Sequence, residues 1–570
     1  MRKFLLHLFV VLPVLLAAQI QQAFLLEDGT IQVEETTLPS TVASRSTFEQ
    51  LEGFPKAFPA NSTFKNFRNL TLVDLDGDGG DEIIFGANNR LYAYTSKGLL
   101  WEKEVIGTAI YPPTVADLDG DGQFEILLAT GGVPNPGRLY LVDEMGEDLK
   151  GWPLNFDDNW VLSAPVVSDV DGDGILEIVA ASREAPTGKV HLLTIEGKSY
   201  SENWPQTLDR TPAVTPSIGD VNGDGEKEIV IFSTASQYVF DLDGNVLEGY
   251  PVAVEGLKHS YQSPILTDLD DDNRLDIIAA GHGDAPEYFA RNFEGNYLEG
   301  WPRPVPFDSW TFSSPSLLNV EGQKQIFMSR PIGGDENEDM LYSWNEQADL
   351  QADFPIVKNG GLEGIISIAD VDGDEEPELI FGSNLYDSNT GTSFLHAYEL
   401  DGGGQVAGFP IRPRGWAFMN GAAIGDVNGD NLMDAVLLTY SQNFGAMPDS
   451  IFVSAYNLEV PYSADRVWWD TYKGSNSRDG VFEEVISSVA TSTTENSFHI
   501  FPNPTQDVIH WTKMESDTQL EIIDALGRTR GILDIENQQA NLSHLAKGLY
   551  FLVAKREGER LGVQKLILID

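Results

Sequence analysis

The residues of this sequence that could do chemistry most clearly are short runs of carboxylates that recur in one frame. Each run reads Asp-x-Asp/Asn-x-Asp-x-x-x-Asp/Glu, and apolar residues follow at once. The seven runs begin at Asp74, Asp117, Asp169, Asp220, Asp268, Asp370 and Asp426. Alternating carboxylates on a curled backbone converge on one point, where their mutual repulsion requires a cation. Oxygen donors without a nearby His or Cys favour Ca²⁺ over zinc or copper.

We predict calcium ligands at positions one, three, five, seven and nine of each run, and therefore about seven calcium ions. Position three is Asp76, Asp119, Asp171, Asn222, Asp270, Asp372 or Asn428. Position five is Asp78, Asp121, Asp173, Asp224, Asp272, Asp374 or Asp430. Position seven is Gly80, Gln123, Ile175, Glu226, Arg274, Glu376 or Leu432. Position nine is Glu82, Glu125, Glu177, Glu228, Asp276, Glu378 or Asp434.

Two other interpretations of these runs are an EF-hand and an ordinary turn. An EF-hand needs a Glu at position twelve and a helix after it. Position twelve is instead Phe85, Leu128, Ala180, Ile231, Ala279, Phe381 or Leu437, within β-branched stretches that are typical of buried strands. Asp and Gly are common in turns, but turn chemistry does not require acids at positions one, three, five and nine together. The loops therefore join two strands, and the apolar residue at position two is expected to anchor each loop to the core.

The spacing of the runs predicts a repeat architecture. Most steps are about fifty residues, the period of a propeller or solenoid array. The step from Asp268 to Asp370 is twice as long, and a degenerate copy, Asn319-Val320-Glu321-Gly322, falls within it. This copy lacks the carboxylates and has Lys324 where the loop would continue, so we interpret it as a unit without an ion. Eight units are favoured, and seven remain possible.

Between the runs, the chain follows one plan of short strands and turns. Each unit holds about four strands and shows almost no helical periodicity, which favours a β-propeller blade over a helical solenoid or a sandwich. Most units end in an aromatic–proline pair, such as Trp152-Pro153 or Trp301-Pro302. The segment Leu51-Glu52-Gly53-Phe54-Pro55 repeats this ending before the first run, and the last unit lacks one. We expect the N-terminal segment to supply the outer strand of the last blade and so close the ring.

The acidic runs followed by Ile/Leu/Val strands resemble the FG-GAP or VCBS-type repeats of integrin α-subunits and many bacterial surface proteins. The resemblance covers roughly residues 46–485 and implies an all-β fold, a calcium-bearing β-propeller. Integrin propellers have seven blades, whereas eight units are counted here.

The two ends of the chain are predicted to be targeting signals that lie outside the ring. Residues 1–18 have a charged start, an apolar stretch and small residues, which is typical of a secretory signal peptide. A leader segment, 19–45, precedes the propeller, and a Ser/Thr-rich linker, 486–497, follows it. Residues 498–570 closely resemble the type A C-terminal sorting domain of the Bacteroidetes type IX secretion system, and include Phe501-Pro502-Asn503-Pro504. The resemblance implies a small β-sandwich that engages the secretion machinery and is removed at the outer membrane.

Composition limits the partners and the environment. The net charge of −52 excludes nucleic acid, whose phosphates require Lys and Arg. No apolar stretch beyond the signal peptide reaches the ~18 residues of a membrane span. The chain has no cysteine, so stability outside the cell must come from the core and the ions. We expect a monomer that is secreted through the periplasm and across the outer membrane, and is then free or attached to the cell surface.

The sequence favours a binding module over an enzyme. It has no thiol, no Gly-x-Ser-x-Gly elbow, no phosphate loop and no His-Glu-x-x-His motif. The histidines His191, His259, His282 and His396 are scattered, and two of them sit in strand patterns. We expect adhesion to a glycan or protein ligand; a lyase-like enzyme acting on polysaccharides and a surface scaffold are the alternatives. Candidate contact loops are residues 183–186, 281–284, 333–336 and 412–416.

Overall fold

The computed structural model shows an all-β protein that divides into two compact units, Met1–Phe482 and Glu483–Asp570. The structure describes residues 19–25, 31–37, 48–61, 66–131, 137–156, 161, 163–331, 337–358, 360, 364–386, 391–400, 404–417, 419–441, 450–482, 500–501, 508–511, 518–524, 529–533, 539–543, 545, 547–556 and 559–568. The predicted signal peptide, the linker and the contact loop 333–336 lie outside these residues. No helix among the described residues has the length and apolar character that a membrane crossing needs.

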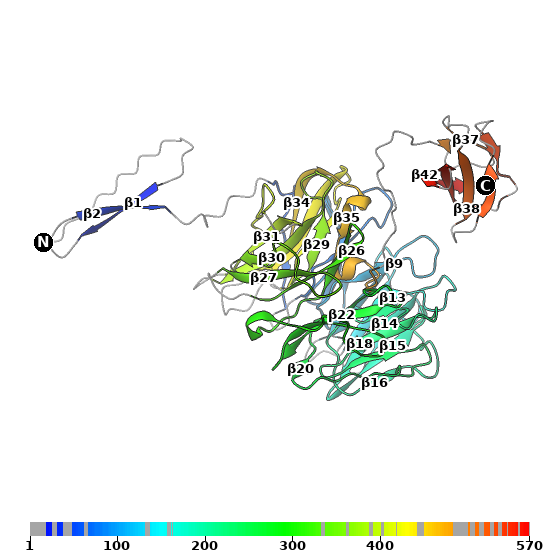
Figure 1. Ribbon diagram of the computed structural model, residues 1–570, viewed down its shortest axis with the longest axis horizontal. Coiled ribbons are helices and arrows are strands. Elements are labelled where there is room, and N and C mark those ends of the chain that lie inside the picture. Colours follow the sequence, from blue (N-terminus) through cyan, green and yellow to red (C-terminus); the bar gives the residue numbers. More distant parts are fainter. Residues whose placement is uncertain are drawn as a thin grey trace. The chain divides into compact units, whose positions relative to one another are not determined.

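Eight antiparallel sheets follow one another along the first unit, and we number them as blades 1 to 8 (Figure 1). Blade 1 holds β4 (Thr71–Val73), β5 (Glu82–Ala87), β6 (Arg90–Thr95) and β7 (Gly98–Glu104). Blade 2 holds β8 (Thr108–Ala109), β9 (Thr114–Ala116), β10 (Glu125–Gly131), β11 (Arg138–Val142) and β12 (Leu154–Asn155). Blade 3 holds β13 (Val166–Ser168), β14 (Glu177–Glu184), β15 (Thr187–Leu193) and β16 (Gln206–Leu208). Blade 4 holds β17 (Ser217–Gly219), β18 (Glu228–Phe232) and β19 (Gln237–Phe240).

The second half of the unit repeats this arrangement. Blade 5 holds β20 (Leu257–Lys258), β21 (Ile265–Thr267), β22 (Asp276–Gly283), β23 (Glu287–Arg291) and β24 (Arg303–Pro304). Blade 6 holds β25 (Ser316–Val320), β26 (Gln323–Ser329), β27 (Glu338–Trp344) and β28 (Ile356–Lys358). Blade 7 holds β29 (Ile366–Ala369), β30 (Glu378–Tyr386), β31 (Gly391–Glu399) and β35 (Val467–Trp469). Blade 8 holds β32 (Ala422–Gly425), β33 (Leu432–Tyr440), β34 (Ser450–Pro461) and the N-terminal β3 (Lys56–Pro59).

The blades close into a ring, which confirms the predicted propeller and its eight units. Strand β3 pairs with β34 from Lys56↔Val453 to Pro59↔Ser450, so the N-terminal segment completes the last blade as expected. Buried side chains join blade 8 to blade 1, where Leu72 and Phe85 share a cluster with Ala423 and Val436. Further clusters bridge each remaining pair of neighbours. The apolar runs after the acidic loops form the second strands and are buried throughout in blades 1 to 5.

Polar side chains also connect neighbouring blades. A hydroxyl on the inner strand of one blade donates to a carbonyl oxygen of the next: Thr71 to Pro113 and Thr114 to Pro165 at 2.6 Å, and Ser217 to Pro264, Ser316 to Ile366 and Ser367 to Ala422 at 2.7 Å. At the outer edge, the aromatic residue of the aromatic–proline pair reaches the following blade: Trp152 donates to Ile195 O, Trp204 to Leu242 O and Trp301 to Glu346 O. The repeated pairs therefore hold the ring together.

The degenerate unit is a full blade with a shortened loop. Strands β25 and β26 are joined by Glu321 and Gly322, with φ of 53° and 85°, as in a two-residue hairpin turn. The sequence prediction that Lys324 lies in a loop is wrong, because Lys324 pairs with Asn319 within the β25–β26 ladder. Eight residues, 74–81, join β4 to β5 in blade 1, whereas two residues join β25 to β26 here.

After β34 the chain runs along the inner strands of the ring. We call this segment, residues 464–482, the strap. It includes two short 3₁₀ turns, η2 (Ala464–Arg466) and η3 (Tyr472–Gly474), on either side of β35. The strap bonds in turn to the inner strands of blades 7, 8, 1, 2, 3, 4 and 5. Trp469 pairs with Ile368 in blade 7, the carbonyl oxygen of Asp470 accepts from Ile424 N in blade 8, and Asn476 donates to Leu72 O in blade 1 and accepts from Val115 N in blade 2. The carbonyl oxygens of Ser477, Asp479 and Gly480 accept from the backbone N of Val167, Ile218 and Leu266, in blades 3, 4 and 5. Each partner lies two residues before the first Asp of an acidic run. The strap thus follows the rim that carries the acidic loops.

Buried cations fix the strap and the centre of the ring. Arg478 is fully buried and donates to Tyr472 O, Thr71 Oγ1 and Pro113 O at 2.7–2.9 Å. Lys473 Nζ donates to Pro216 O and to Ser217 Oγ. Arg68, also fully buried, donates to Tyr261 O, Phe312 O and Gly364 O from three further blades. Arg68 therefore links blades 5, 6 and 7 to one another.

The second unit is a small β-sandwich, as the sequence predicts. One sheet has β36 (Ile500–Phe501), β37 (Val508–Trp511) and β40 (Gln539–Asn541). The other has β38 (Gln519–Asp524), β39 (Thr529–Leu533), β41 (Gly548–Arg556) and β42 (Glu559–Leu568). Both sheets contribute to one core, which includes Ile509, Leu520, Leu552 and Leu566. In the leader segment, β1 (Gln19–Leu25) and β2 (Ile31–Thr37) form an antiparallel hairpin.

Candidate metal centres

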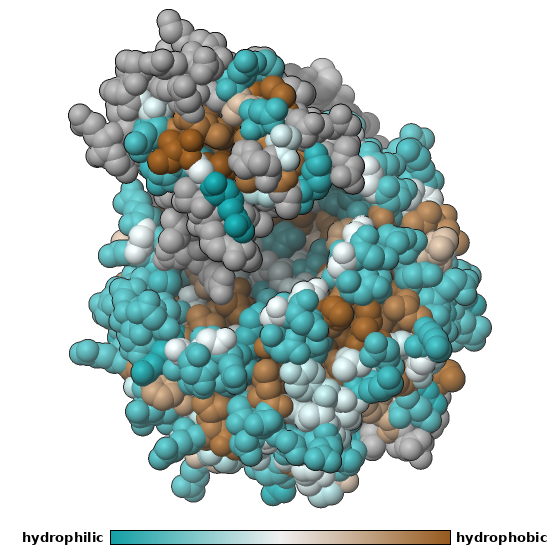
Figure 2. All heavy atoms as spheres, turned by 90° about the vertical axis from the view of Figure 1, so that its right-hand side faces the viewer, coloured by the Kyte–Doolittle hydropathy of each residue, from teal (hydrophilic) through white to brown (hydrophobic). Residues whose placement is uncertain are grey.

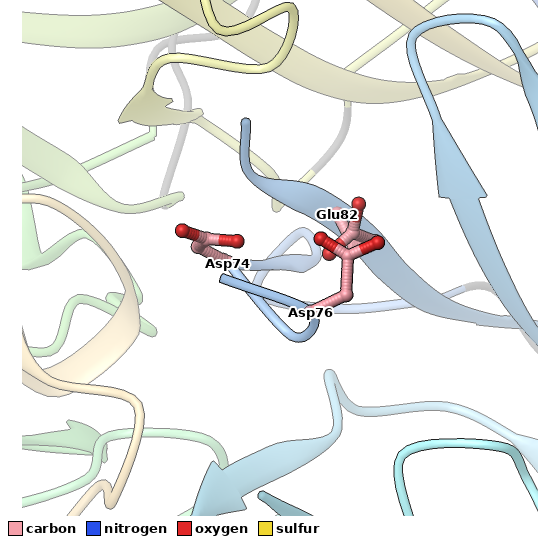
Figure 3. Close-up of side chains that lie close together, drawn as sticks. All are labelled: Asp74, Asp76 and Glu82. Carbon is pink, nitrogen blue, oxygen red and sulfur yellow. The ribbon is translucent and has the colours of Figure 1, made fainter. Parts of the chain in front are cut away.

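Each acidic loop leaves an inner strand and returns as the second strand of the same blade. We define the acidic loops as residues 74–82, 117–125, 169–177, 220–228, 268–276, 370–378 and 426–434, in blades 1 to 5, 7 and 8. Figure 3 shows the first loop, where Asp74, Asp76 and Glu82 lie around the turn between β4 and β5. The carboxylate of Asp74 accepts from Gly77 N at 2.9 Å and from Gly79 N at 3.0 Å. Backbone N–H groups thus hold the position-one carboxylate at the centre of the curl.

The same hydrogen bonds recur in every acidic loop. The position-nine acid accepts from the backbone N of position two at 2.7–3.1 Å in Glu82, Glu125, Glu177, Glu228, Asp276, Glu378 and Asp434. The position-five Asp accepts from the backbone N of position seven in all seven loops. The curl needs positive φ at positions four and six, supplied by Gly in most loops and by Asp271, Asn273, Glu375 and Asn431 in the others. The residues at position two are all buried, so they anchor the loops as predicted.

Carboxylate oxygens gather within each loop. Three acidic side chains can bring oxygens to within 4.8 Å of one another in five loops: Asp74, Asp76 and Glu82; Asp117, Asp119 and Glu125; Asp169, Asp171 and Glu177; Asp268, Asp270 and Asp276; and Asp370, Asp372 and Asp374. In four of these groups positions one, three and nine meet, while the position-five Asp faces the backbone of position seven. At position seven the backbone N–H donates to the position-five Asp, and a role of position seven as an ion ligand stays a prediction.

Two buried oxygens in the acidic loops of blades 7 and 8, outside these five groups, also fit a hard divalent cation. One oxygen each of Glu378 (Oε1) and Asp434 (Oδ1) is buried and lacks a hydrogen-bond partner, while the other oxygen accepts from position two. A buried carboxylate oxygen without a donor is costly unless a cation balances it. The donors are all oxygens, which matches the preference of Ca²⁺. Bound there, the ion would screen the carboxylates from one another and tie the two strand ends together.

Electrostatics support the same conclusion. Burial, and then the neighbouring carboxylates, raise the pKa of the position-nine acid well above its ordinary value. The pKa is about 7 for Glu82, Glu125, Glu177 and Glu228, and about 8 for Asp276, Glu378 and Asp434. Without a cation, these acids would therefore hold protons near neutral pH.

Two loops differ because Asn replaces Asp at position three. In blade 4, Asn222 Nδ2 donates to Asp224 at 3.0 Å and to Glu228 at 2.7 Å. In blade 8, Asn428 Nδ2 donates to Asp430 at 3.0 Å. The amide thus takes the place of one charge and offsets the repulsion of the remaining carboxylates, so these two sites have lower charge.

The acidic loop of blade 7 forms ion pairs with an arginine side chain. Arg466, from the strap, pairs with Asp370 at 3.0 Å and with Glu375 at 2.7 Å. Asp370 is the position-one residue and is buried. Sequence reasoning missed this contact because Arg466 lies outside the repeat.

Neighbouring acidic loops are also bonded to one another. Asp81 donates its N–H to Asp426 O at 2.7 Å and accepts from Asp426 N at 2.8 Å, across the closure between blades 1 and 8. Leu176 N donates to Leu118 O, and Leu275 N to Asp220 O, at the equivalent place in other blades. Three pairs of neighbouring acidic loops are therefore bonded directly to each other.

The comparisons with known proteins agree with this rim and with the C-terminal unit. Residues 74–128 and 134–231 match the family model described as an FG-GAP-like repeat. Residues 499–569 match the model described as a secretion system C-terminal sorting domain. The chain carries FG-GAP-like repeats and a type IX sorting domain. The sorting domain directs secretion across the outer membrane to the cell surface or the extracellular space, and so implies contact with the secretion machinery.

Solved structures align with this chain at low sequence identity. The exotype rhamnogalacturonan lyase YesX is 15% identical, with 77% of this chain and 80% of that chain covered and a TM-score of 0.47. The BP39L lectin from Burkholderia pseudomallei is 10% identical, with 61% and 99% covered and a TM-score of 0.39. The Dos1 propeller is 11% identical, with 73% and 97% covered and a TM-score of 0.39. No curated protein matches the sequence.

Proposed function

We propose that this secreted propeller is a calcium-stabilised recognition module that binds a glycan or protein outside the cell and does no catalysis. In this proposal the seven acidic loops hold Ca²⁺ as a structural ion. The propeller acts as a monomer, and the sorting domain is its export signal.

The observation that carries the proposal is the unequal build of the two ends of the blades. The acidic loops leave the inner strands at one end, where the strap and the loop-to-loop bonds fix them. Because the strands are antiparallel, the connections from second to third strand and from blade to blade lie at the other end. Those connections include the candidate contact loops 183–186, 281–284 and 412–416. A rigid frame with variable loops at one end is the usual layout of a binding scaffold.

We expect the ligand to bind at the surface of the propeller, because the cations Arg68, Lys473 and Arg478 are all buried. On the face seen in Figure 2, hydrophilic side chains predominate and hydrophobic ones form small separate patches. Such a surface suits polar recognition.

The histidines support binding over catalysis. His191 in β15 and His396 in β31 bond to Ser182 and Ser383 within their sheets, which fits the packed roles expected for them. Burial lowers the pKa of His191 to about 4 and that of His259 to about 3. The described partners of these rings are hydroxyl, amide and carbonyl groups, and these give none of them the carboxylate partner of a triad.

A glycan and protein array probed with the full-length chain tests the proposal. In millimolar calcium we expect saturable binding to at least one extracellular ligand, and weaker binding in EGTA because the rim loosens. Each bound polysaccharide is then incubated with the protein, and ultraviolet absorbance is followed. A steady rise from new unsaturated ends would replace our proposal with the lyase alternative; saturable binding without that rise supports it.

A further inference from the structure

Two aromatic rings stand in water on one connection between blades. Twelve large hydrophobic side chains of the described residues are exposed, and the aromatic ones among them are Phe307 and Trp310, 71% and 55% exposed. Both lie in the segment from β24 of blade 5 to β25 of blade 6, which begins with the 3₁₀ turn η1 (Pro306–Asp308). This segment enters β25 at the end opposite the acidic loops.

Each exposed ring rests on a buried side chain. The guanidinium of Arg330 lies 4.4 Å from the centre of the Phe307 ring. The ring of His282 lies 4.7 Å from that of Trp310 at 36°, and Phe312 meets Trp310 edge-on at 6.3 Å. These contacts cover one side of each ring and fix its orientation. The other side faces solvent.

The supporting side chains are themselves held in place. Arg330 donates to Ser309 Oγ at 3.1 Å and pairs with Glu338 at 2.9 Å. His282 is 5% exposed, and its Nε2 bonds Ser260 Oγ at 3.1 Å. The rings are therefore presented on a preorganised base.

The backbone of this segment is strained. Phe307 has φ of 62° and ψ of 22°, and Asp308 has φ of 48°. The left-handed region is unfavourable for a bulky residue, and two such residues in succession are costly. The strained backbone holds the apolar ring of Phe307 in water, so the stability of the fold does not explain this conformation.

From these contacts we infer that Phe307 and Trp310 form a stacking platform for the sugar rings of a neutral polysaccharide. The inference rests on the proposed function and names its ligand class and its site. The C–H face of a pyranose packs on an aromatic ring, while its hydroxyls need polar neighbours. Asp308 and Ser309, between the two rings, provide such neighbours.

Charge decides for a neutral glycan. The chain carries a net charge of −52, which repels uronic or sulfated polymers. Arg330, the cation that contacts the Phe307 ring, has a side chain that is 2% exposed and already paired with Glu338. It therefore offers no free site for a ligand carboxylate.

The test is affinity electrophoresis of the full-length chain in calcium through gels that contain xylan, mannan or a soluble β-glucan, with polygalacturonate as the anionic comparison. We expect at least one neutral polymer to retard the protein. Trp310→Ala and Phe307→Ala should each weaken that retardation at least about tenfold, and Trp310→Phe should retain part of it. Ile106→Ala is the matched control, because Ile106 is 52% exposed on the connection between blades 1 and 2. Thermal melting of each variant shows that loss of binding is not loss of folding.

The outcomes separate the inference from the proposed function. If a neutral polymer retards the wild type and Trp310→Ala equally, the recognition module stands and the platform is wrong. If only polygalacturonate or a protein binds, the recognition module again stands and the neutral-glycan inference is wrong. If nothing on the arrays or in the gels binds, both fail.

Discussion

Glu125→Gln, at position nine of the acidic loop in blade 2, should have opposite effects with and without calcium. Glu125 Oε2 accepts from Leu118 N at 2.8 Å, and Gln keeps an oxygen for that bond. The carboxylate of Glu125 also brings an oxygen to within 4.8 Å of oxygens of Asp117 and Asp119, and Gln replaces one of its oxygens with an amide. The change thus removes an ion ligand without leaving a buried donor unpaired.

The expected magnitudes follow from charge and binding. Without calcium, burial and the nearby aspartates raise the pKa of Glu125 from 4.5 to about 7. The folded state then binds more protons than the unfolded state between these values, and above pH 7 the ionised group costs its full penalty. That penalty is about 3 kcal/mol, reduced to about 1–3 kcal/mol by solvent around the exposed aspartates. In EGTA at pH 8, Glu125→Gln should stabilise the protein by this amount.

With calcium the sign reverses. An ion at a thousand times its Kd stabilises the folded wild type by about 4.1 kcal/mol. The variant loses this contribution but keeps its gain of about 1–3 kcal/mol, so in calcium it should be less stable than the wild type by about 1–3 kcal/mol. Denaturant unfolding in calcium and in EGTA, together with calorimetric counting of bound ions, measures both effects. Glu147→Gln, an exposed acid in a turn of the same blade, is the control and should change neither. An unchanged ion count, or destabilisation of equal size in both buffers, would refute the assignment of the loop.

Three further predictions concern pH, the strap and the degenerate blade. In EGTA the free energy of unfolding should rise as pH falls from 8 to 5, because the position-nine acids, with pKa raised to about 7 or 8, take up protons in the folded state before they do so in the unfolded state. Urea melts at several pH values measure this rise, which should be absent in calcium. Arg478→Met leaves buried carbonyls without a donor and should cost about 3 kcal/mol or more, whereas Arg90→Met, at an exposed ion pair, should cost under about 1 kcal/mol; equal unfolding midpoints would contradict this. Gly322→Ala, at φ of 85° with open space around it, should cost about 1 kcal/mol and leave the ion count unchanged; a lost ion would show that blade 6 holds one.

The repeated parts of the fold could be predicted from the sequence because each repeat obeys the same local physics. Curling the loop needs acids and residues tolerant of positive φ at fixed positions, and the strand that follows must be apolar. Seven copies made that frame visible, and the copy at Asn319 completed the count of eight. The ending at Phe54-Pro55 likewise predicted the pairing of β3 with β34.

The parts that occur once could not be predicted in this way. Residues 464–482 have no periodicity, and they bond to inner strands of seven blades, six of them through their backbone, so the strap is visible only when the ring is closed. Arg466 meets Asp370 across a long stretch of chain for the same reason. Sequence analysis selected residues 281–284 as a contact loop, but Phe307 and Trp310 beside it read as ordinary apolar residues until their exposure was known.

The path of the strap sets where this protein can be cut. A truncation after Pro461 would keep strand β34 but remove β35, Lys473 and Arg478. The inner edges of most sheets would then be open to water. An expression boundary, a protease site or a fused domain placed after Pro461 would therefore damage the propeller. Trimming from the C-terminal side should stop beyond Phe482, and a natural cleavage that removes the C-terminal unit and spares the propeller must fall there too.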